Sequence, residues 1–240
     1  MSAFRQAWPR LALLVAAECL FVGAATWQWQ RAQLKDRRER EFAAALVDAA
    51  QAPRLGFAEL RGLDREYAAT RLRGRLLRDR IVLHDNRMHD GQYGVEVYVP
   101  LALDDGYVLV NLGWIAADRS RRTPPALPAI EADFDAAGLV APAPAIGLLG
   151  GRSGASEAGR PDLRLAIDPA AIAEEAQLQP MLDRVFWPAA EAGSPFRRDW
   201  RPGGIDGDRH RGYALQWASF AVVALLLFLI LSLRREEVRR

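Results

Sequence analysis

Hydrophobic residues divide this chain into two apolar segments, one near each end, and a long polar middle. The first segment covers residues 11–30 and the second covers residues 213–233, which a basic tail at residues 234–240 follows. Each segment approaches the roughly 20 apolar residues that span the hydrocarbon core of a bilayer. The pattern predicts two transmembrane helices, an N-terminal tail at residues 1–10, and one domain over residues 31–212.

The first apolar segment also has features of a cleavable signal peptide. Arg5 and Arg10 precede it, and the small residues Val22 and Ala24 would suit a signal peptidase. The apolar stretch continues to Trp27, however, and tryptophan is typical of the interface of a membrane-spanning helix. A retained anchor is the favoured interpretation, and cleavage stays the alternative.

Positive charges do not settle the orientation of the domain. Basic residues lie at both ends of both apolar segments, and a plain count would place the middle domain in the cytoplasm. The positive-inside rule is weak for long translocated domains, which cross largely regardless of their charge. Charge alone therefore leaves the topology open.

The middle of the chain predicts an α+β domain. Ile81–Leu83, Val95–Val99 and Tyr107–Val110 are β-branched or aromatic runs, and Asp104-Asp105-Gly106 between the last two is a hairpin signal. We expect an antiparallel, barrel-like sheet that the two transmembrane helices flank.

Helical elements are also expected in the domain. The charged and alanine-rich stretch up to Ala50 predicts that the first helix continues out of the membrane. Asp168 can cap a helix that has Pro169 in its first turn and runs to about Gln179. Arg184–Trp187 predicts a final strand.

Composition and motifs exclude several functions. The single cysteine, Cys19, excludes an intramolecular disulfide, and the sequence has none of the standard hydrolase, phosphate-binding or metalloprotease motifs. Arginines alternate with acids, so nucleic-acid binding is not expected. His84 and His89, with neighbouring aspartates, suggest either a metal site or, as the favoured alternative, a solvated turn between strands.

One membrane boundary gathers a histidine, cations, aromatics and amides. In an antiparallel pair of spans these residues lie at similar depth: Trp27, Gln28, Arg31, His210, Tyr213, Gln216 and Trp217. Such a cluster would suit a haem, because imidazole ligates iron, aromatic rings cover the macrocycle, and Arg31 or Arg211 would pair with propionates. From spacing alone, an ordinary aromatic belt with interfacial arginines is the alternative.

Four motifs in chain order resemble the Surfeit locus protein 1 family. They are Trp27-Gln28-x-x-Arg31 with Lys35, then Asn86-Arg87 with Gly94 through Val99-Pro100-Leu101, then Val108-Leu109-Val110-Asn111-x-Gly113-Trp114, and finally His210-x-x-Tyr213-Ala214-x-Gln216-Trp217. The resemblance covers both ends of the chain and the block from residue 70 to residue 115, whereas residues 125–200 match only loosely.

The resemblance implies a function and a topology. Members of that family are non-enzymatic assembly factors for cytochrome c oxidase, implicated in delivering haem a to the catalytic subunit. It implies a multi-pass protein of the bacterial cytoplasmic (inner) membrane, with both termini inside and the domain in the periplasm. His210 matches the histidine implicated in haem binding and would ligate the iron transiently. The oxidase catalytic subunit, haem a synthesis enzymes and membrane lipid are the expected partners.

Three positions depart from expectation. Leu112 stands where the family usually has arginine, and Ala25 stands where it usually has glycine. Glu18 lies in the middle of the first span, where an acidic residue costs roughly 2.5 to 3.5 kcal/mol on insertion scales. We hypothesise that Glu18 contacts an oxidase subunit or a haem-synthesis enzyme.

The leading hypothesis is a chaperone in which His210 ligates haem iron, Arg31 neutralises a propionate, and Gln28 and Gln216 hydrogen-bond across the helix pair. The alternative is a two-span membrane sensor or scaffold whose extracytoplasmic domain binds a ligand without haem. The tail after the second span is short for an output domain, which counts against a sensor.

Overall fold

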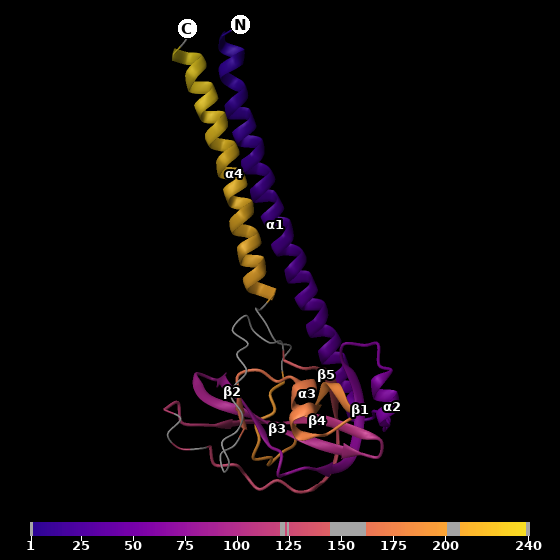
Figure 1. Cartoon of the computed structure of the whole chain (residues 1–240). Helices are drawn as coiled ribbons and strands as arrows, with labels where there is room; N and C mark the ends of the chain where they lie inside the picture. Colours follow the sequence, from indigo (N-terminus) through magenta and orange to yellow (C-terminus); the bar gives the residue numbers. More distant parts are fainter. Residues whose placement is uncertain (1, 121–122, 124, 145–161, 201–206, 239–240) are drawn as a thin grey trace. The chain divides into compact units, whose positions relative to one another are not determined.

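The computed structural model describes residues 2–120, 123, 125–144, 162–200 and 207–238 (Figure 1). The chain divides into two compact units, one of residues 1–40 and 204–240 and the other of residues 41–203. The long helices α1 (Ser2–Ala49) and α4 (Gly207–Val238) are long and apolar enough to cross a membrane, by length and composition. Both predicted apolar segments are therefore helical, and each helix extends beyond its segment.

Within the first unit, α1 and α4 pack against each other through small residues (Figure 1). Ala32 is 2% exposed, Ala214 6% and Ala221 8%, and Gly207, seven residues before Ala214, is also buried. Small residues that recur every seven positions let two helix backbones approach closely along one face. This close approach brings the longer side chains beside the alanines into contact.

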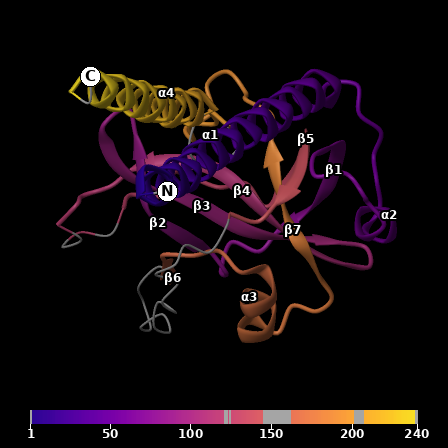
Figure 2. The same cartoon turned by 90° about the horizontal axis from the view of Figure 1, so that it is seen from above.

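The second unit is built on a seven-stranded sheet with the order β1-β5-β7-β4-β3-β2-β6, and β1 also pairs with β3 (Figure 2). Its strands are β1 (Ala68–Leu76), β2 (Val82–His89), β3 (Gln92–Leu103), β4 (Gly106–Ala116), β5 (Asp133–Pro142), β6 (Asp162–Arg164) and β7 (Met181–Pro188). Two short helices, α2 (Phe57–Arg61) and α3 (Pro169–Ala176), accompany the sheet.

The prediction of an antiparallel sheet is wrong, because the sheet is mixed, whereas the barrel-like shape stays a prediction. Strand β7 pairs parallel with β4 and antiparallel with β5, and β6 pairs parallel with β2. A parallel partner needs a crossover connection rather than a hairpin. The connection that contains α3 lets β7 join the sheet between β4 and β5 in this direction.

Several local predictions are confirmed. The hairpin between β3 and β4 turns at Asp104 and Asp105. The Asp168 carboxylate accepts hydrogen bonds from the backbone amides of Ala170 and Ala171, at 3.0 and 3.3 Å, and so caps α3. That helix ends earlier than predicted, because Gln177 adopts a left-handed conformation with φ of 58°. The first helix does continue to Ala49.

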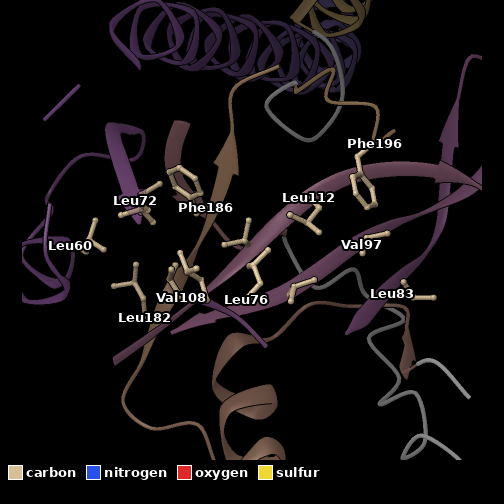
Figure 3. Close-up of a cluster of buried hydrophobic side chains, with 14 of the residues drawn as sticks. Leu60, Leu72, Leu76, Leu83, Val97, Val108, Leu112, Leu182, Phe186 and Phe196 are labelled. Atoms are coloured by element: carbon tan, nitrogen blue, oxygen red, sulfur yellow. The ribbon is translucent and has the colours of Figure 1, made fainter. Parts of the chain in front are cut away.

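The apolar core of the sheet includes the unusual Leu112. Its side chain is 3% exposed and belongs to a cluster with Val97 and Phe196 (Figure 3). An arginine with this side-chain direction would carry its guanidinium into an apolar core, where an unpaired charge is very costly. Leucine at this position therefore serves the packing of the sheet.

A buried polar network crosses β2, β3 and β4. The Glu96 carboxylate accepts hydrogen bonds from Arg87 Nε at 2.9 Å, Tyr98 Oη at 3.1 Å and Asn111 Nδ2 at 3.1 Å. His84 Nδ1 lies 3.5 Å from the same carboxylate. Burial alone would raise the pKa of Glu96, but hydrogen bonds and charges from His84 and Arg87 outweigh burial and lower it to about 2.

This network predicts how the stability of the domain depends on pH. Because folding lowers the pKa of Glu96 from 4.5 to about 2, its contribution is fully present above pH 4.5 and is lost as pH falls towards 2. Glu96→Gln should therefore lower the free energy of unfolding at pH 7 by up to about 3 kcal/mol. The difference from the wild type should shrink steadily below pH 4.5.

Urea unfolding of the detergent-solubilised chain, followed by tryptophan fluorescence, measures this difference. Glu174→Gln is the matched control, because Glu174 is exposed on α3. Equal unfolding midpoints for the two variants at pH 7 would show that the Glu96 network does not stabilise the fold.

Candidate functional site

His210 and Gln28 meet where α4 begins. His210 lies in the first turn of α4, and its Nδ1 is 2.7 Å from Oε1 of Gln28 on α1. Both side chains are half-buried. Because the amide oxygen only accepts, Nδ1 must carry the hydrogen and donate it.

This hydrogen bond determines which nitrogen of His210 is free. In a neutral imidazole with hydrogen on Nδ1, Nε2 keeps its lone pair and is the nitrogen that can ligate a metal. Nε2 has no hydrogen-bond partner within the described ranges. Gln28 therefore orients the imidazole ring and leaves the Nε2 lone pair available to ligate a metal.

Aromatic side chains continue the same face of the helix pair. Trp217 lies seven residues after His210 and stacks on Phe21, with ring centroids 5.9 Å apart and an interplanar angle of 29°. Phe220 packs edge-on against both rings, with centroids at 5.9 and 5.7 Å. Phe21 lies seven residues before Gln28, so helical periodicity gives the aromatic cluster and the His210–Gln28 pair a common side.

The predicted cations have different surroundings. Arg31 is exposed, and its guanidinium lies 5.8 Å from the centroid of the Trp27 ring. Arg211 instead forms two hydrogen bonds of 3.1 Å with the two carboxylate oxygens of Asp36. Of the two arginines considered for propionates, Arg31 is the one without an ion pair among residues that the structure describes.

The remaining predicted residues lie on the outside of the helix pair. Trp27 is 53% exposed and Tyr213 49% exposed, and Gln216 is exposed as well. The expected hydrogen bond between Gln28 and Gln216 does not form in the described part of the chain, because Gln28 pairs with His210, which lies six residues earlier on α4. Trp27 and Tyr213 are therefore exposed aromatic residues, one directly before Gln28 and the other three residues after His210 in the chain.

Glu18 lies seven residues before Ala25 on α1. Its Oε1 is shielded from solvent and has no hydrogen-bond partner among the described residues. The helix period places this carboxyl near the face that α1 presents to α4. The sequence singles out Glu18 but does not indicate which way its side chain points. Its contact with another membrane protein stays a hypothesis.

The central motifs meet in one corner of the sheet. Trp114 Nε1 donates to the Arg87 carbonyl at 2.9 Å, and a side chain at Gly94 would lie 2.4 Å from the Trp114 ring. Gly113 has φ of +131°, and a Cβ there would lie 2.7 Å from the Arg197 carbonyl oxygen. Gly113 lies within β4 at an irregularity in its pairing with β3, not at a turn, and these motif residues hold strands together.

His84 and His89 were expected to form either a metal site or a solvated turn between strands, and neither expectation fits both residues. His84 is 4% exposed within the polar network of β2, so it does not lie in a solvated turn. His89 Nε2 lies 3.1 Å from Asp199. No group of three or more histidine, cysteine, aspartate and glutamate side chains is placed to hold a metal ion in the ranges described above.

A groove of about 660 Å³ opens elsewhere on the sheet unit. The segments 63–66, 142–144, 167–169 and 183–184 line it. Arg184 in its wall already donates hydrogen bonds to the backbone carbonyls of Arg65 and Glu66. None of the residues predicted to bind a cofactor lies in this groove.

The Gln28 contact predicts the tautomer of His210. In mildly alkaline buffer, ¹⁵N-histidine spectra of the full chain in detergent should show His210 protonated at Nδ1 and unprotonated at Nε2. Gln28→Leu removes the acceptor, so the proton should redistribute between both nitrogens. His210→Ala assigns the signal, since the chain has only three histidines.

Gln30→Leu is the matched control, because Gln30 is an exposed glutamine two residues further along α1. A His210 spectrum that is the same in wild type and Gln28→Leu would contradict the predicted role of Gln28.

Comparison with known proteins identifies the family of the chain. A model of the SURF1 family matches residues 15–222, from the first span to the second. No curated protein matches the chain. The match covers most of the chain and includes most of α1, the first half of α4 and the whole sheet unit. The chain therefore belongs to the SURF1 family, which is known for cytochrome c oxidase assembly.

Proposed function

We propose that this protein helps to deliver haem a to, or insert it into, the catalytic subunit of cytochrome c oxidase, and that His210 is its iron ligand. The observation that carries the proposal is the His210–Gln28 hydrogen bond, which directs Nδ1 into the helix pair and leaves the Nε2 lone pair free. Family membership supplies the link to the oxidase.

The surrounding residues suit a large, planar, anionic cofactor. Trp27 and Tyr213 are exposed aromatic rings near His210, and Trp217 extends the aromatic surface towards Phe21. Arg31 can donate a charge-assisted hydrogen bond to a carboxylate. Haem a would supply only an iron centre that accepts a nitrogen ligand and propionates that accept hydrogen bonds.

The work proposed for the chain is to bind and release, not to catalyse a reaction. A single imidazole on an open helix surface gives the cofactor a route of transfer to another membrane protein. In this proposal the sheet unit lies in the periplasm, both termini lie in the cytoplasm, and α1 and α4 cross the bacterial inner membrane. Haem a synthesis enzymes would be the donors, and the oxidase catalytic subunit the acceptor.

The test is an optical spectrum of the detergent-purified chain after co-expression with haem a synthesis. We expect a haem a spectrum for the wild type and its loss in His210→Ala, because that variant removes the only proposed ligand. His89→Ala is the control, since His89 belongs to the sheet unit.

Two results would contradict the proposal. A colourless wild-type protein, with haem a available, would favour a scaffold that grips an oxidase subunit without cofactor. A His210→Ala protein that keeps its full haem a spectrum would assign the ligand elsewhere.

A further inference from the structure

Asp36 and Arg211 form an ion pair between α1 and α4. Arg211 Nη1 and Nη2 lie 3.1 Å from Asp36 Oδ1 and Oδ2, respectively. Two parallel hydrogen bonds between a guanidinium and a carboxylate fix orientation as well as distance. The side chain of Arg211 is 40% exposed and that of Asp36 is 27% exposed, so the pair is partly shielded from water.

Gly207 provides the space in which this ion pair forms. A Cβ on Gly207 would lie 2.6 Å from Asp36 Oδ1, 3.1 Å from Arg211 Nη1 and 3.5 Å from the Ala32 carbonyl oxygen. The carboxylate cannot easily move away, because Arg211 holds both of its oxygens. The glycine and the ion pair therefore depend on each other.

The ion pair lies beside His210 in the chain. Arg211 follows His210 directly and Gly207 precedes it by three residues, so all three belong to the first turns of α4. An α-helix has 3.6 residues per turn. If the pairing of α4 with α1 moved by one residue, the direction of the His210 side chain would therefore change by about 100°. Such a rotation would break the 2.7 Å contact with Gln28.

We propose that Asp36, Arg211 and Gly207 form a latch that fixes the pairing of α1 with α4 and thereby holds His210 against Gln28. Asp36 and Arg211 are then positioning residues, and Arg211 does not bind the propionates of the cofactor. The inference deepens the proposed function, because it explains how the iron ligand is oriented. Its first test, the tautomer of His210, does not depend on haem.

The first measurement is the ¹⁵N-histidine spectrum of the full chain in detergent. Asp36→Asn, Arg211→Gln and Gly207→Ala should each convert the Nδ1-protonated His210 signal into a mixture of tautomers. Arg209→Gln is the control for removing a cation, since Arg209 is exposed on the same turn. Gly212→Ala is the control for Gly207→Ala, because nothing lies within 4 Å of a Cβ at Gly212.

The second measurement is a haem a titration of the same variants. The three latch variants should weaken haem a binding by up to about fivefold, the upper end of the range expected for a partly exposed ion pair. The controls should bind like the wild type. His210 remains in every variant, so a partial loss of affinity rather than a loss of binding is expected.

The double variant Asp36→Arg with Arg211→Asp separates latching from a general effect of charge. Each side chain on a helix leans towards the N-terminus of its own helix, so on two antiparallel helices facing side chains lean towards each other. An arginine on α1 can therefore reach an aspartate on α4 in the same way that Arg211 now reaches Asp36. The double variant should restore both the His210 signal and the affinity for haem a.

The outcomes distinguish the latch from the proposed function. Wild-type tautomer signals in all three latch variants, or a charge-swapped protein as impaired as Asp36→Asn, would overturn the latch. If the wild type binds no haem a, the proposed function fails, while the tautomer spectra still decide whether the latch exists.

Discussion

The close approach of α1 and α4 is the constraint on which the candidate site depends. Small residues seven positions apart, Ala25 and Ala32 on one helix and Gly207, Ala214 and Ala221 on the other, let the backbones come near each other. In a membrane, lipid tails are as apolar as leucine, so helices associate through close packing and hydrogen bonds rather than through burial of apolar surface. The histidine and the glutamine can meet only because these neighbours are small.

The position of Glu18 differs from the rest of this interface. It lies seven residues before Ala25, where the repeat would favour another small residue, and its Oε1 has no partner among the residues described. A shielded polar atom without a hydrogen bond is costly in an apolar medium. Glu18 is thus a costly residue on the face that α1 presents to α4, whereas the polar contacts at His210 and Arg211 join the two helices.

The sequence was a good guide to elements with strong local signals. Two long apolar runs, the Asp104-Asp105 turn and the Asp168 cap each have a local physical cause, and each was predicted. Strand β5 contains the run Ala136-Ala137-Gly138, which has low strand propensity, and so it was missed. The parallel pairing of β7 and the buried position of His84 depend on contacts between distant segments, which no local pattern reveals.

Contacts within the candidate site are equally hard to predict from local sequence patterns. Matching the depths of the two spans gathered seven residues at one boundary, but it paired Gln28 with Gln216 instead of His210. Gly207 lies against Asp36 and Ala32 where the helices pair, and a glycine before a predicted span gives no sign of such a contact in one sequence. The exposure of Trp27 and Tyr213 likewise follows from that pairing.

The two groups of family motifs have different physical roles in this chain. The sheet motifs join strands: Asn111 bonds within the Glu96 network, and Gly94 and Gly113 make room for Trp114 and the segment at Arg197. The helix motifs instead contribute exposed aromatic rings, the cation of Arg31 and the Nε2 lone pair of His210. Leu112 belongs to the first group, since its side chain fills the core. Leucine in place of the family's usual arginine therefore bears on the packing of the sheet.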